Sequence, residues 1–185
     1  MTSEILFPVF SIPLYITKVS DWELKKQKIV SNCKLLNHIT QKDQTNEFIE
    51  TDFYINQKND ALDVGKIFSN EIKNFCSAIN ANKYTVRRSW IERQQTNMYH
   101  LVHNHGSLGY SAVCYLEYDS RHHQPLHFVA PFCNFKNGEQ IDYCPENIEE
   151  SSLLIFPSML LHYTVPNQSK LPRTAVSFNM DLEYV

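Results

Sequence analysis

The second part of the chain is the feature that most restricts its fold. From about residue 84 onward, short segments rich in β-branched and aromatic residues alternate with polar or proline-containing turns. A polar stretch over 132–151 is predicted to be a long loop. So many short strands in succession predict a β-sandwich or barrel. The predicted strands are 84–93, 95–103, 110–117, 126–131, 152–156, 161–165 and 173–183.

The first part of the chain predicts two helices that pack against this β structure. A helix over 20–36 begins with a Ser-Asp cap signal and carries a rough apolar stripe of Trp22, Leu24, Ile29, Val30 and Cys33. A stronger stripe runs through 59–80, with Leu62, Phe68, Ile72, Phe75, Cys76 and Ile79. Asn59 or Asp60 can cap this second helix, and Asn80 can end it.

Two short extended segments complete the prediction for the first part. Residues 5–19 contain two prolines, which fit an edge strand better than a central one. Residues 48–55 predict a short strand within a polar region. Because no linker is visible, we expect one domain over 1–185, with a supporting part at 1–83 and a β core at 84–185.

Charge and cysteine content narrow the possible partners and compartments. The net charge is −3 and the basic residues are scattered, so the basic footprint of a nucleic-acid binder is missing. No apolar run reaches the roughly 18 residues of a membrane span, and the N-terminus does not resemble a signal peptide. Five cysteines without a CxxC pair favour free thiols and therefore a cytoplasmic location.

A histidine cluster in "YHLVHNHGSLG" at 99–109 is the first candidate for a functional site. On a strand, alternating side chains put His103 and His105 on one face and His100 on the other. Neutral imidazole is the commonest metal ligand in proteins, so such a pair can hold a metal at the end of a strand, with Gly106 and Ser107 turning the chain away. The alternative is a half-exposed strand whose histidines make local hydrogen bonds. The letters "HNH" alone are no evidence for a nuclease.

A second candidate lies in "SLLIFPSMLLHYTVPNQSKLPRTAVSFNM" at 152–180. His162 opens one predicted strand, and Arg173 and Ser177 share a face of the last one. Burying an isolated cation is costly, so a buried Arg173 requires an anionic partner, for which a carboxylate is the natural choice. The alternative is an arginine that is exposed or paired with a carboxylate of the protein itself.

Together, the stretches "HNHGSLGYSAVCYL" and "IFPSMLLHYTVPNQSKLPRTAVSFN" resemble the iron(II)/2-oxoglutarate-dependent oxygenases over residues 90–180. The similarity is greatest to the prolyl-hydroxylase-like branch and its small members in marine bacteria and phages. It implies a mainly β fold, a double-stranded β-helix of the jelly-roll or cupin type with flanking N-terminal helices. It also implies a dioxygenase that uses Fe(II), 2-oxoglutarate and O2 to hydroxylate a substrate that the sequence does not identify.

The resemblance implies roles for individual residues. His103 and His162 would be iron ligands, and Arg173 would bind the distal carboxylate of 2-oxoglutarate. Ser177 and Tyr115 would assist that contact. The chain departs from the family at the position of the usual carboxylate ligand, where it has His105.

We expect His105 to be the third ligand, because it shares the strand face of His103. Glu117 and Asp119 are the alternative carboxylates. Three neutral ligands would also fit a three-histidine cupin-type enzyme that does not use 2-oxoglutarate. A non-catalytic barrel that binds a small acid is a further alternative.

The remaining histidines receive weaker predictions. His100 is expected to be structural, and His122 and His123 are expected to be solvated in a loop. His127 either lines the pocket or packs in the core. Trp90, Asn97 and Tyr99 are candidates for the substrate side. A small molecule and a peptide are both possible substrates, and the oligomeric state is not predicted.

Overall fold

The computed structural model describes residues 11–32, 48–53 and 63–184. Ten strands and three helices lie in these segments. The helices are α1 (Trp22–Asn32), α3 (Val64–Ile67) and α4 (Ser69–Ala78). The strands are β1 (Tyr15–Lys18), β2 (Glu50–Thr51), β3 (Ala81–Gln94), β4 (His100–His103), β5 (Tyr110–Glu117), β6 (His127–Cys133), β7 (Gln140–Tyr143), β8 (Ser152–Pro157), β9 (Leu161–Thr164) and β10 (Arg173–Tyr184).

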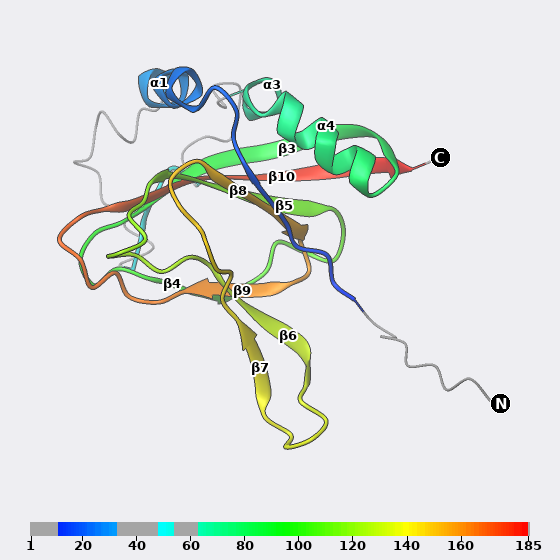
Figure 1. Cartoon of the computed structure of the whole chain (residues 1–185), viewed down its shortest axis with the longest axis vertical. Coiled ribbons are helices and arrows are strands. Elements are labelled where there is room, and N and C mark those ends of the chain that lie inside the picture. Colours follow the sequence, from blue (N-terminus) through cyan, green and yellow to red (C-terminus); the bar gives the residue numbers. More distant parts are fainter. Residues whose placement is uncertain (1–10, 33–47, 54–62, 185) are drawn as a thin grey trace.

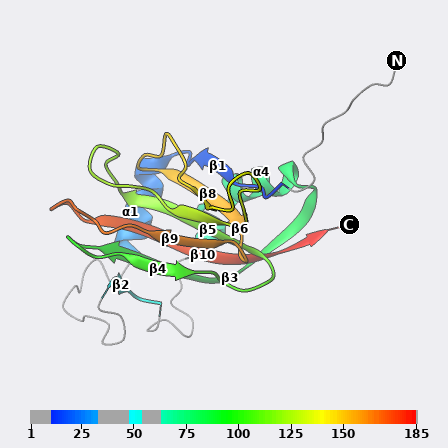
Figure 2. The same cartoon turned by 90° about the horizontal axis from the view of Figure 1, so that it is seen from below.

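The strands form two antiparallel sheets. The major sheet has the order β1-β8-β5-β10-β3-β2, and the minor sheet has the order β4-β9-β6-β7. The helices lie over the face of the major sheet that points away from the minor sheet (Figure 1). Figure 2 shows β1 and β2 at opposite edges of the molecule. This is the expected double-stranded β-helix with flanking N-terminal helices.

Strand alternation gives the major sheet two different faces. On β10, Val176, Phe178 and Met180 belong to the core between the sheet and the helices, which also contains Phe68 and Ile72 of the helical segment. Ala175, on the opposite face of β10, belongs to a second core between the two sheets, together with Tyr115, Phe128 and Phe156. The predicted faces of the last strand are therefore confirmed, and its second face points into the space that contains the candidate site.

Most strand predictions agree with the structure, and two are wrong. β5 coincides with the predicted 110–117, and β1 is an edge strand as expected. β4 begins only at His100, because the chain turns at Asn97, which has a φ of +67°. β7 lies within the predicted loop 132–151 and pairs with β6 in a hairpin that projects from the sheets (Figure 1). Its sequence QIDY is mostly exposed and lacks the apolar alternation that reveals a half-buried strand.

The second predicted helix is two helices separated at Phe68. The carboxylate of Asp63 accepts a hydrogen bond from the Lys66 N–H and caps α3, while Asn59 and Asp60 lie outside the described residues. Asn80 follows the end of α4 with a φ of +56°, as expected for a residue that stops a helix.

The apolar stripe expected along the first helix is confirmed only in part, and Trp22 packs against the core. Ile29 is fully buried, but Leu24 is 63% exposed and Val30 is also exposed. Cys33 lies outside the described residues. The helix is therefore anchored by polar contacts as well, including an indole N–H of Trp22 that donates to Glu150 at 2.8 Å.

The thiols of Cys76, Cys114, Cys133 and Cys144 are free, as expected. None of the helices in the described segments is both long and apolar enough to span a membrane. The cytoplasmic location stays a prediction.

Candidate metal centre and arginine pocket

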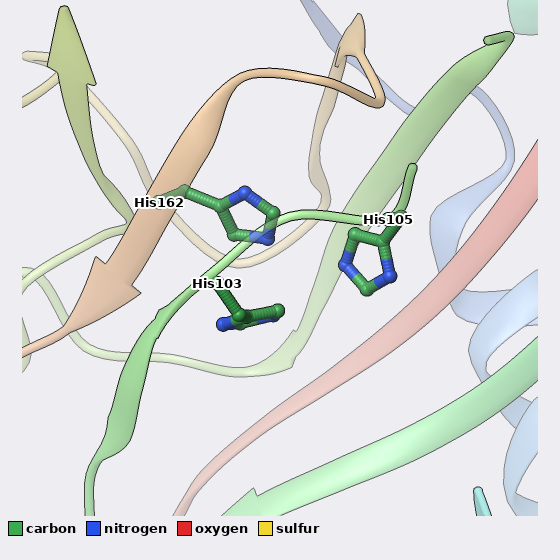
Figure 3. A group of neighbouring side chains, drawn as sticks. All are labelled: His103, His105 and His162. Atoms are coloured by element: carbon green, nitrogen blue, oxygen red, sulfur yellow. The ribbon is translucent and has the colours of Figure 1, made fainter. Parts of the chain in front are cut away.

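Three histidines converge between the two sheets. His103 is the last residue of β4, His162 lies opposite it on β9, and His105 follows two residues after β4 ends. One ring nitrogen from each residue can be chosen so that all three atoms lie within 4.8 Å of one another. Figure 3 shows the three rings turned toward a common space. The structure thus brings together all three predicted metal ligands.

The backbone around His105 explains how this residue joins the pair. Its N–H donates to the Ser158 carbonyl oxygen at 2.9 Å, which ties the segment to the turn between β8 and β9. The next residue, Gly106, has a φ of +105°, a conformation that residues with a side chain rarely adopt. The chain therefore turns immediately after His105, as the sequence predicts.

Hydrogen bonds determine the tautomers of two of these imidazoles. Nδ1 of His103 lies 2.7 Å from the Leu101 carbonyl oxygen, and Nδ1 of His162 lies 2.8 Å from that of Leu160. A carbonyl oxygen only accepts hydrogen bonds, so both Nδ1 atoms carry the hydrogen and donate it. The lone pair of each neutral ring is then on Nε2, where a metal can bind.

Burial keeps these histidines neutral. It lowers the pKa of His162 to about 3, with a further contribution from the adjacent His103. The pKa of His105 falls to about 4, again through burial first and His103 second. Burial and the neighbouring His100 lower the pKa of His103 as well. At neutral pH all three are therefore in the form that binds metals.

His100 contacts the cluster, so the prediction that it faces away is wrong. The register between β4 and β9 shifts between His100 and His103, so that two intervening residues on β4 lie opposite one on β9. Such a bulge breaks the alternation of side chains. The His100 ring consequently stacks on the His103 ring, with centroids 3.9 Å apart.

The two carboxylates proposed as alternative ligands bind elsewhere. Glu117 lies 2.7 Å from the guanidinium of Arg93, and Asp119 lies 2.6 Å from that of Arg121. Among the described residues, the potential metal-binding group contains histidines only. Glu92 of β3 is connected to this group through His100. Its Oε2 lies 3.5 Å from Nδ1 of His100, whose ring stacks on His103. Glu92 was not among the predicted site residues; its alternation with Trp90 along one predicted strand was the only available signal.

Arg173 is buried at the start of β10, with 3% of its surface exposed. Its Nη1 donates to Oε1 of Gln94 at 3.3 Å. Its Nε and Nη2 are buried without a hydrogen-bond partner in the described part of the chain. A buried cation with two unused donors requires an anion, and a carboxylate can accept both N–H groups of a guanidinium. The donor set thus fits an acidic ligand.

A cavity of about 230 Å³ opens beside this guanidinium. Its wall contains mostly polar residues from β3, the loop before β6 and the turn before β10. The residues are Gln94, His122, His123, Gln124, Val165, Pro166, Asn167, Gln168 and Arg173. Gln94 is a site residue that no local sequence pattern predicts, because its side chain is placed beside Arg173 only by the pairing of β3 with β10.

Tyr115 and Ser177 lie on the same side of the major sheet as Arg173. The guanidinium carbon is 5.1 Å from the centre of the Tyr115 ring, and the Tyr115 hydroxyl accepts a hydrogen bond from the Leu126 N–H at 2.9 Å. Burial raises the pKa of Tyr115, although the charge of Arg173 opposes this. Ser177 is buried four residues beyond Arg173, and no hydrogen bond joins these two described residues. Its role in ligand binding stays a prediction.

The loop histidines differ from the expectation. His122 is exposed, as predicted, but His123 is buried. The two ring nitrogens of His123 contact the Asp119 N–H and the Leu171 carbonyl oxygen, so it holds the wall of the arginine pocket together. His127 lies on β6 and binds Asp142 and Gln124, and it does not line the arginine pocket.

Comparisons with known proteins agree with this geometry. A family model described as "Putative 2OG-Fe(II) oxygenase" matches residues 88–179, which include the histidines and Arg173. No curated protein sequence matches the chain.

Solved structures with similar folds have low sequence identity. A prolyl-4-hydroxylase from Pseudomonas putida has a TM-score of 0.61 at 10% identity, over 95% of this chain and 94% of that one. The viral collagen prolyl hydroxylase of Paramecium Bursaria Chlorella virus-1 has a TM-score of 0.58 at 11% identity, over 90% and 94%. HygX from Streptomyces hygroscopicus, solved with nickel and 2-oxoglutarate bound, has a TM-score of 0.61 at 10% identity, over 92% and 83%. The matched family model and the double-stranded β-helix together show that the chain belongs to the iron(II)/2-oxoglutarate-dependent oxygenase superfamily, whose members are oxidoreductases.

Proposed function

We propose that this protein is an iron(II)/2-oxoglutarate-dependent dioxygenase that hydroxylates an organic substrate. In this proposal His103, His105 and His162 bind the iron, and Arg173 binds the distal carboxylate of 2-oxoglutarate. The observation that carries it is the buried guanidinium whose Nε and Nη2 have no hydrogen-bond partner among the described residues. Gln94 and Thr164 connect this guanidinium to β9, which pairs with β4, and these two strands carry His162 and His103.

The chain's own residues contribute binding, orientation and exclusion of water. When bound, iron(II) and 2-oxoglutarate supply the oxidising chemistry that protein side chains lack. Gln94 holds the guanidinium from one side, and Tyr115 packs beside it. The Leu101 and Leu160 carbonyls accept hydrogen bonds from Nδ1 of His103 and His162, which leaves the Nε2 lone pair of each ring available to a metal. Such positioning is the main contribution of a protein to cofactor chemistry.

The three-histidine set by itself also fits a cupin-type enzyme without 2-oxoglutarate. The arginine pocket favours 2-oxoglutarate, because a buried cation without an acidic ligand would remain uncompensated. The third alternative, a non-catalytic barrel, would bind a small acid at Arg173 and would need no metal.

An anaerobic titration with iron(II) and then 2-oxoglutarate tests the proposal and separates these alternatives. We expect about one iron per chain and a visible charge-transfer band when 2-oxoglutarate is added. His162→Ala should lose both, whereas His127→Ala, a histidine of the same sheet outside the cluster, should keep both. Iron binding without the band would support the cupin-type alternative. No iron binding by the wild type would support the non-catalytic barrel and overturn the proposal.

A further inference from the structure

A second cavity of about 230 Å³ borders the histidine cluster from another side. Its wall combines aliphatic and aromatic side chains with one carboxylate, that of Glu92. The lining residues are Ile49, Thr51, Phe53, Trp90, Glu92, His100, His103, Asn104 and His105. Two of the three proposed iron ligands therefore face the same cavity as Glu92.

Contacts connect Glu92 with both of these histidines. Oε1 of Glu92 accepts a hydrogen bond from Trp90 Nε1 at 2.8 Å, and the Trp90 ring packs against His105 with centroids 5.3 Å apart. Oε2 lies 3.5 Å from Nδ1 of His100, whose ring stacks on His103. The carboxylate and two of the proposed metal ligands thus line one small cavity, together with the rings of Trp90 and His100.

Glu92 retains its charge and spare acceptor capacity in this position. Burial raises the pKa of its carboxyl group, but His100 and the indole N–H of Trp90 outweigh this and lower it below the usual range. A carboxylate can accept about four hydrogen bonds. Trp90 provides one at normal length, and His100 approaches only at 3.5 Å. A further donor, preferably a charged one, would stabilise the ionised group.

We propose that this cavity binds a substrate through a cationic nitrogen, an ammonium or guanidinium group, held by Glu92. The inference rests on the proposed function and deepens it by naming the chemical class of the substrate. The Trp90 side chain, which lines the cavity, provides a second attraction for a cation or for the carbon chain attached to it. The carbon chain then extends from Glu92 toward His103 and His105, where the iron is expected.

The cavity size limits what can enter. Its volume of about 230 Å³ lies below the roughly 300–1,000 Å³ of pockets for larger ligands. A small free amine or one basic side chain of a peptide fits such a space. Both sources present the same charged group to Glu92.

Fluorescence provides a direct test, because the chain contains only two tryptophans, Trp22 and Trp90. In a Trp22→Phe background, Trp90 reports on the cavity that it lines. The probes are n-butylammonium, with butanol and butyrate as neutral and anionic counterparts of similar size, and Nα-acetyl-lysine methylamide as a blocked peptide unit. We expect both cations to bind about tenfold more tightly than butanol. We expect Glu92→Gln to abolish that preference.

The titration is done on the chain without metal and on the chain loaded with cobalt(II) and 2-oxoglutarate. Ligand-observed NMR repeats it, so that a silent fluorescence signal does not decide the result. Circular dichroism and cobalt content show whether Glu92→Gln is folded and loaded. Equal affinities for butylammonium and butanol, tighter binding of butyrate, no detectable cation binding, or a preference that survives in a folded Glu92→Gln would each overturn the inference.

Failure to bind cobalt would instead contradict the proposed function, while the preference measured without metal would still test the Glu92 site. The two cationic probes also separate the possible sources. Tighter binding of the blocked lysine supports a peptide substrate, and tighter binding of the free amine supports a small metabolite.

Discussion

Arg173 and Gln94 are cross-strand partners on β10 and β3, and the arginine Nη1 donates to the glutamine Oε1 at 3.3 Å. Gln94 is fully buried, and its Nε2 donates to the Thr164 hydroxyl on β9. The same hydroxyl accepts a hydrogen bond from the His100 N–H at 2.8 Å. One side chain therefore holds the guanidinium and also connects the major sheet with the minor sheet that carries His103 and His162.

Replacing the arginine should separate cofactor binding from metal binding. In Arg173→Ala, we expect 2-oxoglutarate affinity to fall by at least about 30-fold, the lower end of the effect of removing one partner of a buried charge pair. Iron content should not change, because the histidines do not contact the lost group directly. Calorimetric titration of the iron-loaded chain measures the 2-oxoglutarate affinity, and metal analysis measures the iron content. Arg121→Ala, which removes an exposed guanidinium paired with Asp119, is the control and should bind 2-oxoglutarate with wild-type affinity. Unchanged affinity in Arg173→Ala would show that the acid binds elsewhere.

Gln94 offers a test of how the arginine is held. Gln94→Glu has nearly the same shape but places a carboxylate next to Nη1, where it would compete with 2-oxoglutarate for the guanidinium. We expect 2-oxoglutarate affinity to fall about tenfold or more, with the iron content preserved. Gln140→Glu makes the same chemical change on the exposed strand β7 and should have no effect. If Gln94→Glu and Gln140→Glu bind 2-oxoglutarate with equal affinity, Gln94 has no part in positioning Arg173.

The sequence predicted those parts of the site that depend on order along the chain. Alternation along 173–183 placed Arg173 and Ser177 on one face, and the structure confirms it because β10 pairs with β3 without a register shift from Arg173 to Asn179. The same rule was wrong for His100, because a bulge in β4 lies between His100 and His103. A bulge depends on pairing with β9, which no local pattern in 95–103 reveals.

Long-range pairing also explains the residues that were missed. Glu92 lies in the predicted strand 84–93 and Gln94 directly follows it. Their importance comes from β10, about 80 positions later, which puts Ala175 and Arg173 opposite them. His123 was expected to be solvated because its neighbours in "DSRHHQPL" are polar. Its burial results from the Leu171 carbonyl, 48 positions away. Contacts across such distances require the register of the sheets.

The position of His105 allows the unusual ligand set to be tested. His105→Ala should lower metal affinity by at least about tenfold, because one of three protein ligands is lost. His105→Asp replaces it with the carboxylate more common in this superfamily, and we expect metal binding to be retained. Cobalt(II) binding followed by its visible absorption measures both. Wild-type affinity in His105→Ala would show that only His103 and His162 bind the metal.

Glu71 on α4 is a buried carboxylate whose contribution to stability can be measured. Lys25 Nζ lies 2.9 Å from it, and Ser20 donates from its N–H at 2.9 Å and from its hydroxyl at 2.8 Å. Glu71→Gln should lower the free energy of unfolding by about 3 kcal/mol at neutral pH, because it leaves the partly buried Lys25 without its counter-charge. Urea denaturation measures this loss. Glu183→Gln breaks an exposed pair with Lys83 and should cost no more than about 1 kcal/mol.

The same pair gives the protein a defined dependence on pH. Burial raises the pKa of Glu71, but Lys25 and Ser20 lower it more, so its pKa in the folded chain lies below the ordinary value of 4.5. The unfolded chain therefore binds a proton first as the pH falls. The contribution of Glu71 to stability is complete above pH 4.5 and is lost progressively as the pH falls through the lowered pKa. The stability difference between wild type and Glu71→Gln should consequently shrink below pH 4.5. A difference that stays constant with pH would show that the carboxylate charge does not contribute to stability, because only an ionised Glu71 can pair with Lys25.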